Sequence, residues 1–197
     1  MAKKRKTKSI KIKGTPVRLP PYTIISVART LTQSQGWGIK QLGVPDTWTI
    51  TKGEGQTVMV IDTGYTDHID LAGATLQDQS RDFIGEGLKD LNGHSSHCCG
   101  IIGARDNTVG MVGVAPECNI ITCKVLSKDG MGDYNGIIAA LDYAIQIKPS
   151  VVSMSLGGPV DDTRVHDRIK TLYAMNIPVV CAAGNEGPGE NTMGYPA

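Results

Sequence analysis

The 197-residue chain is long enough for one domain with a hydrophobic core, and it combines 40% hydrophobic residues with 24 glycines and few aromatic residues. No apolar run approaches the length that crosses a bilayer, and no apolar signal segment follows the basic start, so we expect no membrane segment and a cytoplasmic location. The five cysteines then fit reduced thiols better than a disulfide framework.

Charge is divided unevenly along the chain. The net charge is only +1, yet residues 1–45 hold ten of the 20 Lys and Arg and none of the 19 Asp and Glu. The remainder is therefore strongly acidic. A basic arm before an acidic body is typical of a solvated segment that touches nucleic acid, or of a segment that docks on its own body.

The body alternates between strand patterns and helix patterns. Short apolar runs rich in β-branched residues predict buried strands at 57–61, 119–126, 151–156 and 178–185. Apolar and small residues at helical spacing predict helices at 94–104, 135–147 and 163–175. This alternation predicts an α/β fold, with a mostly parallel sheet and helices on both faces, whose chemistry gathers at the carboxyl ends of the strands.

Two polar residues stand at the ends of predicted strands. Asp62 closes the run VMVID, and Asn185 closes the run VVCAAGN. Either side chain could serve a turn beside glycine, and on spacing alone this is the commoner use of such an Asp. An amide at the position of Asn185 could also donate to an oxyanion.

The stretch GHSSHCCG at 93–100 has three interpretations. His94 and His97 could share a helical face and bind zinc, but further ligands are missing, and Cys98 and Cys99 point in different directions around the helix. A disulfide between the two adjacent cysteines would be strained. The third interpretation is a general base, a histidine that a buried carboxylate orients and that activates a nucleophile.

Taken in order, the motifs VIDTG, GHSSHCCG, GMVGVAP, KVLSKDGMGDY, SMSLGG and AAGNEGP resemble those of the subtilisin-like serine proteases, closest in style to the intracellular subtilisins. The resemblance runs from about residue 33 to residue 197. It implies the subtilisin-like three-layer fold and hydrolysis of protein or peptide substrates. It also implies that His94 is the base, Asp62 its orienting carboxylate and Asn185 the oxyanion donor.

The resemblance also implies a substrate site with two strand-like edges and a pocket wall. The residues expected to contact substrate are Ser155, Leu156, Gly157, Gly130, Gly132, Tyr134, Ala182, Gly184 and Glu186. In the histidine helix, Ser95 replaces the glycine usual in the family and is expected to tighten the site. His97 is expected to pack in the helix, and Cys98 to lie near the base, with sensitivity to thiol reagents as a by-product.

A calcium site is implied by the same resemblance. The expected ligands are the side chains of Gln33, Asp70 and Asn107 and the backbone carbonyls of Arg105, Val109 and Met111. Oxygen ligands of this kind suit Ca²⁺ as a structural ion. The alternative is an ordinary surface turn without a metal.

The basic N-terminal arm, residues 1–32, resembles the short inhibitory segment of the intracellular subtilisins, and residues 33–197 form the catalytic domain. Its stretch LPPY is expected to lie across the active site, with Leu19 and Tyr22 in subsites and Pro20 and Pro21 holding a register that is poorly cleaved. Binding of nucleic acid by KKRKTK is the weaker interpretation of the arm.

The family's serine nucleophile is expected beyond Ala197, since no serine follows Ser155 in this chain. We therefore expect the N-terminal portion of a serine endopeptidase, incomplete at its C-terminal end and inactive by itself. A second chain that supplies the remainder would be a variant of this hypothesis. The alternative is a non-catalytic subtilisin-like binding module or decoy.

Overall fold

The computed structural model describes residues 16–19 and 32–197, and the expectations for Pro20, Pro21 and Tyr22 lie outside that part. The centre of the described part is a parallel sheet of five strands in the order β4-β6-β3-β8-β9. These strands are β3 (Thr57–Asp62), β4 (Arg81–Asp82), β6 (Asn119–Lys124), β8 (Val151–Met154) and β9 (Val179–Cys181).

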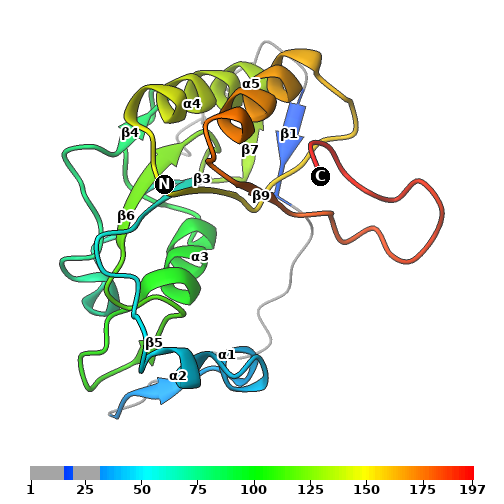
Figure 1. Ribbon diagram of the computed structural model, residues 1–197. Helices are drawn as coiled ribbons and strands as arrows, with labels where there is room; N and C mark the ends of the chain where they lie inside the picture. Colours follow the sequence, from blue (N-terminus) through cyan, green and yellow to red (C-terminus); the bar gives the residue numbers. More distant parts are fainter. Residues whose placement is uncertain (1–15, 20–31) are drawn as a thin grey trace, which may run out of the picture.

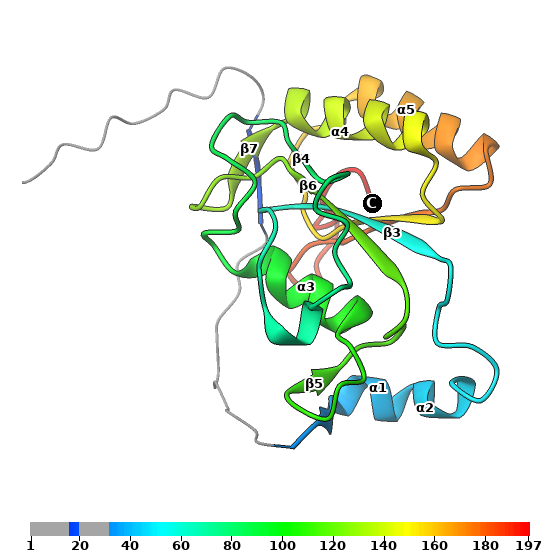
Figure 2. The same cartoon turned by 90° about the vertical axis from the view of Figure 1, so that its left-hand side faces the viewer.

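Helices cover both faces of this sheet (Figure 1). The helices α4 (Tyr134–Ile147) and α5 (Thr163–Ala174) lie side by side over one face, and α3 (His94–Gly103) lies under the other (Figure 2). The three layers confirm the predicted α/β fold. No helix in the described ranges combines the length and apolar character that a membrane span requires.

The central strand β3 and the helix α4 show why these segments fold as they do. Residues 58–62 of β3 are all buried, because the strand is paired on both sides and covered on both faces. The helix α4 begins where the Asp133 carboxylate accepts a hydrogen bond from the Gly136 N–H. It turns Ile137, Ala140 and Leu141 into the core beneath it.

Short elements that the hydrophobic pattern did not predict complete the fold. They are β1 (Pro16–Arg18), β2 (Ser34–Gln35), α1 (Trp37–Gln41), α2 (Val44–Thr47), the 3-10 helix η1 (Ile69–Leu71), β5 (Met111–Val112) and β7 (Met131–Asp133). The strand β1 pairs antiparallel with β7, and β2 pairs parallel with β5. The helices α1 and α2 lie at the far end of the molecule from α4 and α5 (Figure 1).

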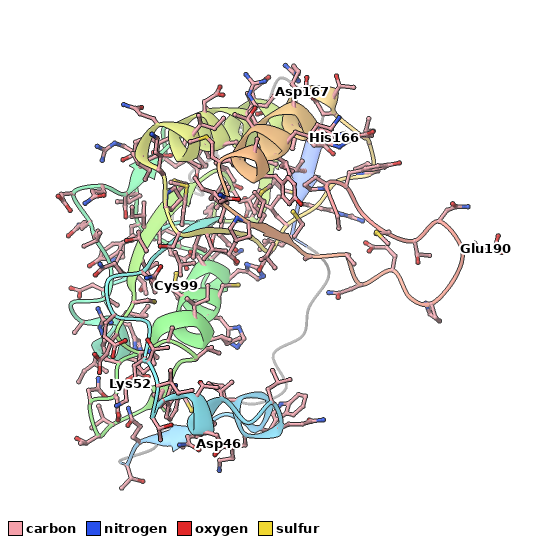
Figure 3. All side chains as sticks on the ribbon, viewed as in Figure 1. Asp46, Lys52, Cys99, His166, Asp167 and Glu190 are labelled. Atoms are coloured by element: carbon pink, nitrogen blue, oxygen red, sulfur yellow. The ribbon has the colours of Figure 1, made fainter. Side chains whose placement is uncertain are left out.

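The structure contains the long predicted strands, but some of them are shorter than predicted. The runs expected at 119–126 and 178–185 are strands only over Asn119–Lys124 and Val179–Cys181. Their remaining residues form the loops at the carboxyl edge of the sheet. Beyond β9, the loop that carries Glu190 extends away from the layers (Figure 3).

Candidate active site

Asp62 and His94 meet at the carboxyl edge of the sheet. Asp62 is the last residue of β3, and His94 is the first residue of α3. The His94 Nδ1 atom lies 2.9 Å from both carboxylate oxygens of Asp62. The Asp62 side chain is fully buried, whereas 16% of the His94 side chain is exposed. The pair thus has one sheltered end and one end open to a reactant.

The buried carboxylate changes the acid–base behaviour of His94. Burial of the imidazole disfavours its charged form, but the hydrogen bonds with Asp62 and Cys98 and the negative charge of Asp62 together outweigh this effect. The pKa of His94 is therefore raised above its ordinary value of 6.5. An imidazole held in this way can accept a proton on its exposed nitrogen while the carboxylate stabilises the charge that forms.

Two residues that sequence reasoning missed fix the backbone beside Asp62. The Thr63 N–H donates to Asp62 Oδ1 over 2.6 Å. Lys124 lies opposite Asp62 in β6, is fully buried, and donates its ammonium group to the carbonyls of Thr63 and Leu126 at 2.6 and 3.0 Å. The signal was visible in the sequence, because a lysine inside the apolar run IITCKVL needs buried acceptors.

The structure corrects two expectations about α3. His97 is exposed, so it does not pack as expected. Ser95 is fully buried, and its hydroxyl lies 3.9 Å from the Cys99 thiol, so it faces the interior of the fold and does not tighten the substrate side. In the described part, the donor atoms of Asp62, His94 and Cys98 lie within 4.8 Å of one another, a group that does not include His97.

The two adjacent cysteines have different surroundings. Cys98 is half-buried, and its sulfur lies 3.8 Å from His94 Nδ1. Cys99 is buried in the core, as Figure 3 shows on α3, and this burial raises the pKa of its thiol. The thiol of Cys98 is thus the one that adjoins the histidine, and both thiols are free.

The two expected substrate edges face each other across the N-terminal arm. Arg18 exchanges two backbone hydrogen bonds with Gly157, of 3.1 and 3.3 Å. The Leu19 N–H donates to the Gly130 carbonyl over 3.1 Å. Gly130 has a φ of +71°, and a Cβ there would lie 3.1 Å from the Leu19 side chain, so a larger residue would disturb this pairing. The described part of the arm, residues 16–19, thus lies between both edges as an added strand.

Val17 is the most deeply buried residue of the described arm, with only 1% of its surface exposed. It joins the core cluster that contains Tyr134 and Leu156. Leu156, another member of this cluster, is fully buried. Sequence reasoning placed Leu19 in a subsite but missed Val17, because an isolated valine in a basic segment gives no local signal.

A cavity of about 860 Å³ opens beside the arm. Ala182 and Gly184, which were expected in the pocket wall, and Glu186, which was expected near the base of the pocket, all line it, together with Arg18 and Gly157. The two remaining edge residues are Ser155, half-buried after β8, and Gly132 in β7.

Asn185 stands in the loop at the carboxyl end of β9. Because β9 and β3 run parallel in one sheet, Asn185 follows a strand at the same edge as Asp62. It is exposed, and its backbone N–H donates to the Glu186 carboxylate over 2.9 Å. Glu186 is also exposed and lines the cavity, so it is not buried at the base of the cavity.

The residues expected to bind calcium converge around η1 and the loop after α3. The Gln33 amide donates to the Arg105 carbonyl over 2.8 Å, and the Met111 N–H donates to Asp70 Oδ2 over 3.0 Å. Asn107 bridges the Ile69 carbonyl and the Val109 N–H. Asp70 is only 7% exposed, and its Oδ1 atom has no hydrogen-bond partner among the described residues. The backbone of Gly110 lies so close to this carboxylate that a Cβ at position 110 would collide with it.

Comparison with known proteins gives a consistent result. Residues 53–197 match the model of the subtilase family, peptidase S8. The chain is 40% identical over 188 residues to the intracellular serine protease of Paenibacillus polymyxa, and the aligned region covers 91% of this chain and 57% of the relative. It is 39% identical over 170 residues to the major intracellular serine protease of Bacillus subtilis, covering 81% and 53%. For subtilisin DY of Bacillus licheniformis the identity is 37% over 184 residues, covering 90% and 60%.

A three-layer α/β fold with a buried Asp–His pair at the carboxyl edge of its parallel sheet places the chain in the class of proteins that carry the Asp–His arrangement of a catalytic triad. Within that class, the chain belongs to the subtilase family. It spans between 53% and 60% of the length of the three relatives described.

Proposed function

We propose that this chain is the part of a serine endopeptidase that supplies its base, its orienting carboxylate and its oxyanion donor. The observation that carries this proposal is the contact of the His94 Nδ1 atom with the buried Asp62 carboxylate, 2.9 Å away. The relatives' names support the reaction class. Two of those names include the word intracellular, which supports a place of action inside the cell.

The proposed mechanism assigns one task to each residue. Asp62 holds the Nδ1 proton of His94, so that the opposite nitrogen, Nε2, is the one that accepts the proton of a serine hydroxyl. The serine oxygen then attacks the peptide carbonyl, and His94 returns the proton to the leaving amine. The Asn185 side-chain amide donates to the oxyanion that forms. The serine is part of this proposal and not of the described geometry.

The proposed substrate binds as a strand between Gly130 and Gly157. The arm supports this assignment, since its own backbone pairs with both residues. A substrate in this position would place one side chain over Tyr134 and another toward the cavity lined by Gly184. Protein and peptide chains are therefore the proposed partners.

The arm itself is proposed to inhibit the enzyme. It occupies the same backbone partners that a substrate needs, and Val17 is buried beside Tyr134. Competition for these positions would keep the protein inactive until the arm leaves. The contributions of Pro20, Pro21 and Tyr22 stay predictions, because they lie outside the described residues.

Hydrolysis of an unfolded protein substrate tests the proposed function. The protein is expressed from its complete natural reading frame, with and without residues 1–32, and casein cleavage is followed by mass spectrometry. We expect internal peptide bonds to be cleaved, and faster without the arm. A protein that binds casein but cleaves none of it would instead be a binding module.

Alkylation of Cys98 is expected to inactivate the enzyme. Its sulfur lies 3.8 Å from His94 Nδ1, so an added group would crowd the imidazole. Treatment with N-ethylmaleimide should remove more than about nine-tenths of the activity, and Cys98→Ala should be resistant. Cys181, which is also half-buried, provides the control. If Cys181→Ser rather than Cys98→Ala confers resistance, the predicted route of inactivation is wrong.

Calcium is proposed as a structural ion. Asp70 supplies a buried carboxylate oxygen without a described partner, beside the Arg105 carbonyl and the Asn107 amide, and this donor set suits a hard cation. The side chain of Gln33 and the carbonyls of Val109 and Met111 would complete the site. When bound, the ion would neutralise Asp70 and hold the loop after α3 against η1.

Removal of calcium is expected to lower the Tm of the protein. At a calcium concentration of about 100 times Kd the ion adds about 2.7 kcal/mol. For a chain of this size, that corresponds to a Tm loss of about 5–10 °C in EDTA. Asp70→Asn should abolish the calcium response, and Asp78→Asn, an exposed acid elsewhere, should keep it. A Tm that is the same with calcium and with EDTA would contradict the site.

A further inference from the structure

One carboxylate outside the Asp62–His94 pair receives an unusual number of hydrogen bonds. Asp90 Oδ1 accepts from the Thr63 hydroxyl at 2.9 Å and from the N–H groups of Asn92 and Gly93 at 3.0 and 2.8 Å. Asp90 Oδ2 accepts from the N–H and the hydroxyl of Ser96 at 2.9 and 2.6 Å. Only 9% of Asp90 is exposed, so these bonds are sheltered from water.

Asp90 contributes a side-chain cap to the start of the helix α3. The residue before the helix is Gly93, which offers no side-chain cap. The first N–H groups of a helix need acceptors, and a negative charge at this end is favourable. Asp90 accepts a hydrogen bond from the Ser96 N–H although it lies outside the helix, and it thereby helps to fix the start of α3 at His94.

Asp90 also reaches the strand that carries Asp62. The Thr63 hydroxyl donates to Asp90 and accepts from the Ser95 N–H at 3.0 Å. The backbone N–H of Thr63 donates to Asp62 Oδ1 over 2.6 Å. Thr63 is therefore bound to the Asp62 carboxylate on one side and to the start of α3 on the other.

We propose that Asp90, through Thr63, is a positioning residue that sets the geometry of the Asp62–His94 pair. The pair joins residues 32 positions apart in the sequence, so its distance depends on how the end of β3 sits against the start of α3. Asp90 bonds both to Thr63, the residue that follows β3, and to Ser96 in the first turn of α3. This inference rests on the proposed hydrolase function.

The charge of Asp90 is retained at neutral pH. Its burial alone would disfavour the charged form, but the hydrogen bonds from Ser96 and Gly93 outweigh that effect. The pKa of Asp90 is therefore lowered below its ordinary value. An ionised carboxylate makes stronger hydrogen bonds than a neutral side chain of the same shape.

The test compares Asp90→Asn with Asp82→Asn in the protein expressed from its complete natural reading frame. Asp82 also accepts three backbone N–H groups, from Ile84, Gly85 and Gly87, but in a loop at β4. For Asp90→Asn we expect kcat to fall about 10- to 100-fold, because a displacement of the reacting groups by up to about 1 Å has an effect of this size. We expect KM to change less than about twofold, because Asp90 does not contact the substrate. Asp82→Asn should keep both values.

A second readout does not require catalysis. The His94 Nδ1 proton is followed by NMR across a pH titration, and its bond to Asp62 reports the geometry of the pair. In Asp90→Asn we expect the proton signal to weaken and the pKa of His94 to fall, while Asp82→Asn titrates like wild type. If the wild-type protein hydrolyses nothing, the proposed function fails, but this titration still decides the role of Asp90.

Two conservative variants keep the test decisive if Asp90→Asn does not fold. Thr63→Val removes the hydroxyl that links Asp90 to β3 and leaves the other Asp90 bonds in place, whereas Thr63→Ser retains it. We expect Thr63→Val to share the His94 shift and Thr63→Ser to restore wild-type behaviour. Asp90 would be no more than a loop brace if Thr63→Val and Asp90→Asn both titrate and turn over like wild type.

Discussion

Replacing Asp62 with asparagine is expected to lower kcat/KM by about 10⁴-fold. The asparagine occupies the same volume but cannot hold the Nδ1 proton of His94 as a carboxylate does, because an amide favours the wrong tautomer. Asp62 is fully buried, so no water replaces the lost acceptor. The measurement is kcat/KM for a peptide substrate, with the protein expressed from its complete natural reading frame.

The pH profile separates loss of this interaction from general damage. The pKa of His94 is raised by Asp62, and the base must be neutral to accept a proton, so wild-type activity should rise toward alkaline pH. Without the carboxylate, the largest influence that raises the pKa of His94 is lost, so burial, which lowers this pKa, is opposed only by Cys98. The residual activity of Asp62→Asn should therefore begin at lower pH. A variant with near wild-type rates, or with an unshifted acid limb, would contradict the assignment.

Replacing Val17 with aspartate is expected to release the arm and raise activity about 10- to 100-fold. Burial of a valine side chain contributes about 1.5–3 kcal/mol, and each 1.4 kcal/mol corresponds to tenfold in affinity. A charge placed beside Tyr134 and Leu156 would also be without a partner in that apolar cluster. The measurement is the initial rate of peptide cleavage before any processing of the arm.

Pro16→Ala is the matched control for the arm. Pro16 belongs to the same strand as Val17, but its side chain is exposed. This variant should therefore keep the low wild-type rate. If Val17→Asp and wild type cleave the peptide at equal rates, the arm does not inhibit, and its place between the two edges has another role.

The layers of the fold could be predicted from the sequence because they depend on long apolar patterns. The run TVMVID at β3 is apolar enough for a central strand, and NGIIAALDYAIQI shows the helical spacing of α4. The short strands β4 and β7 have no apolar pattern of their own. Their pairing depends on tertiary contacts, so periodicity could not predict them.

Only those site residues could be predicted that stand at the end of a predicted strand or within an ordered series of motifs. Asp62 and His94 were singled out in this way, and the structure places them in hydrogen-bond contact. The supporting residues were not predicted, because their roles exist only in three dimensions. Asp90 acts across a loop, and Lys124 acts through the carbonyl of Thr63. The burial of Val17 also depends on partners more than a hundred residues away along the chain.

The most direct test of the account is labelling with a serine-directed fluorophosphonate, read out by intact mass. The protein expressed from its complete natural reading frame and its His94→Ala variant are compared after removal of the arm. The account predicts one adduct on the wild-type protein and almost none on the variant, because His94 activates the serine. A wild-type protein that takes no label would contradict the account, and the groove would then belong to a binding module.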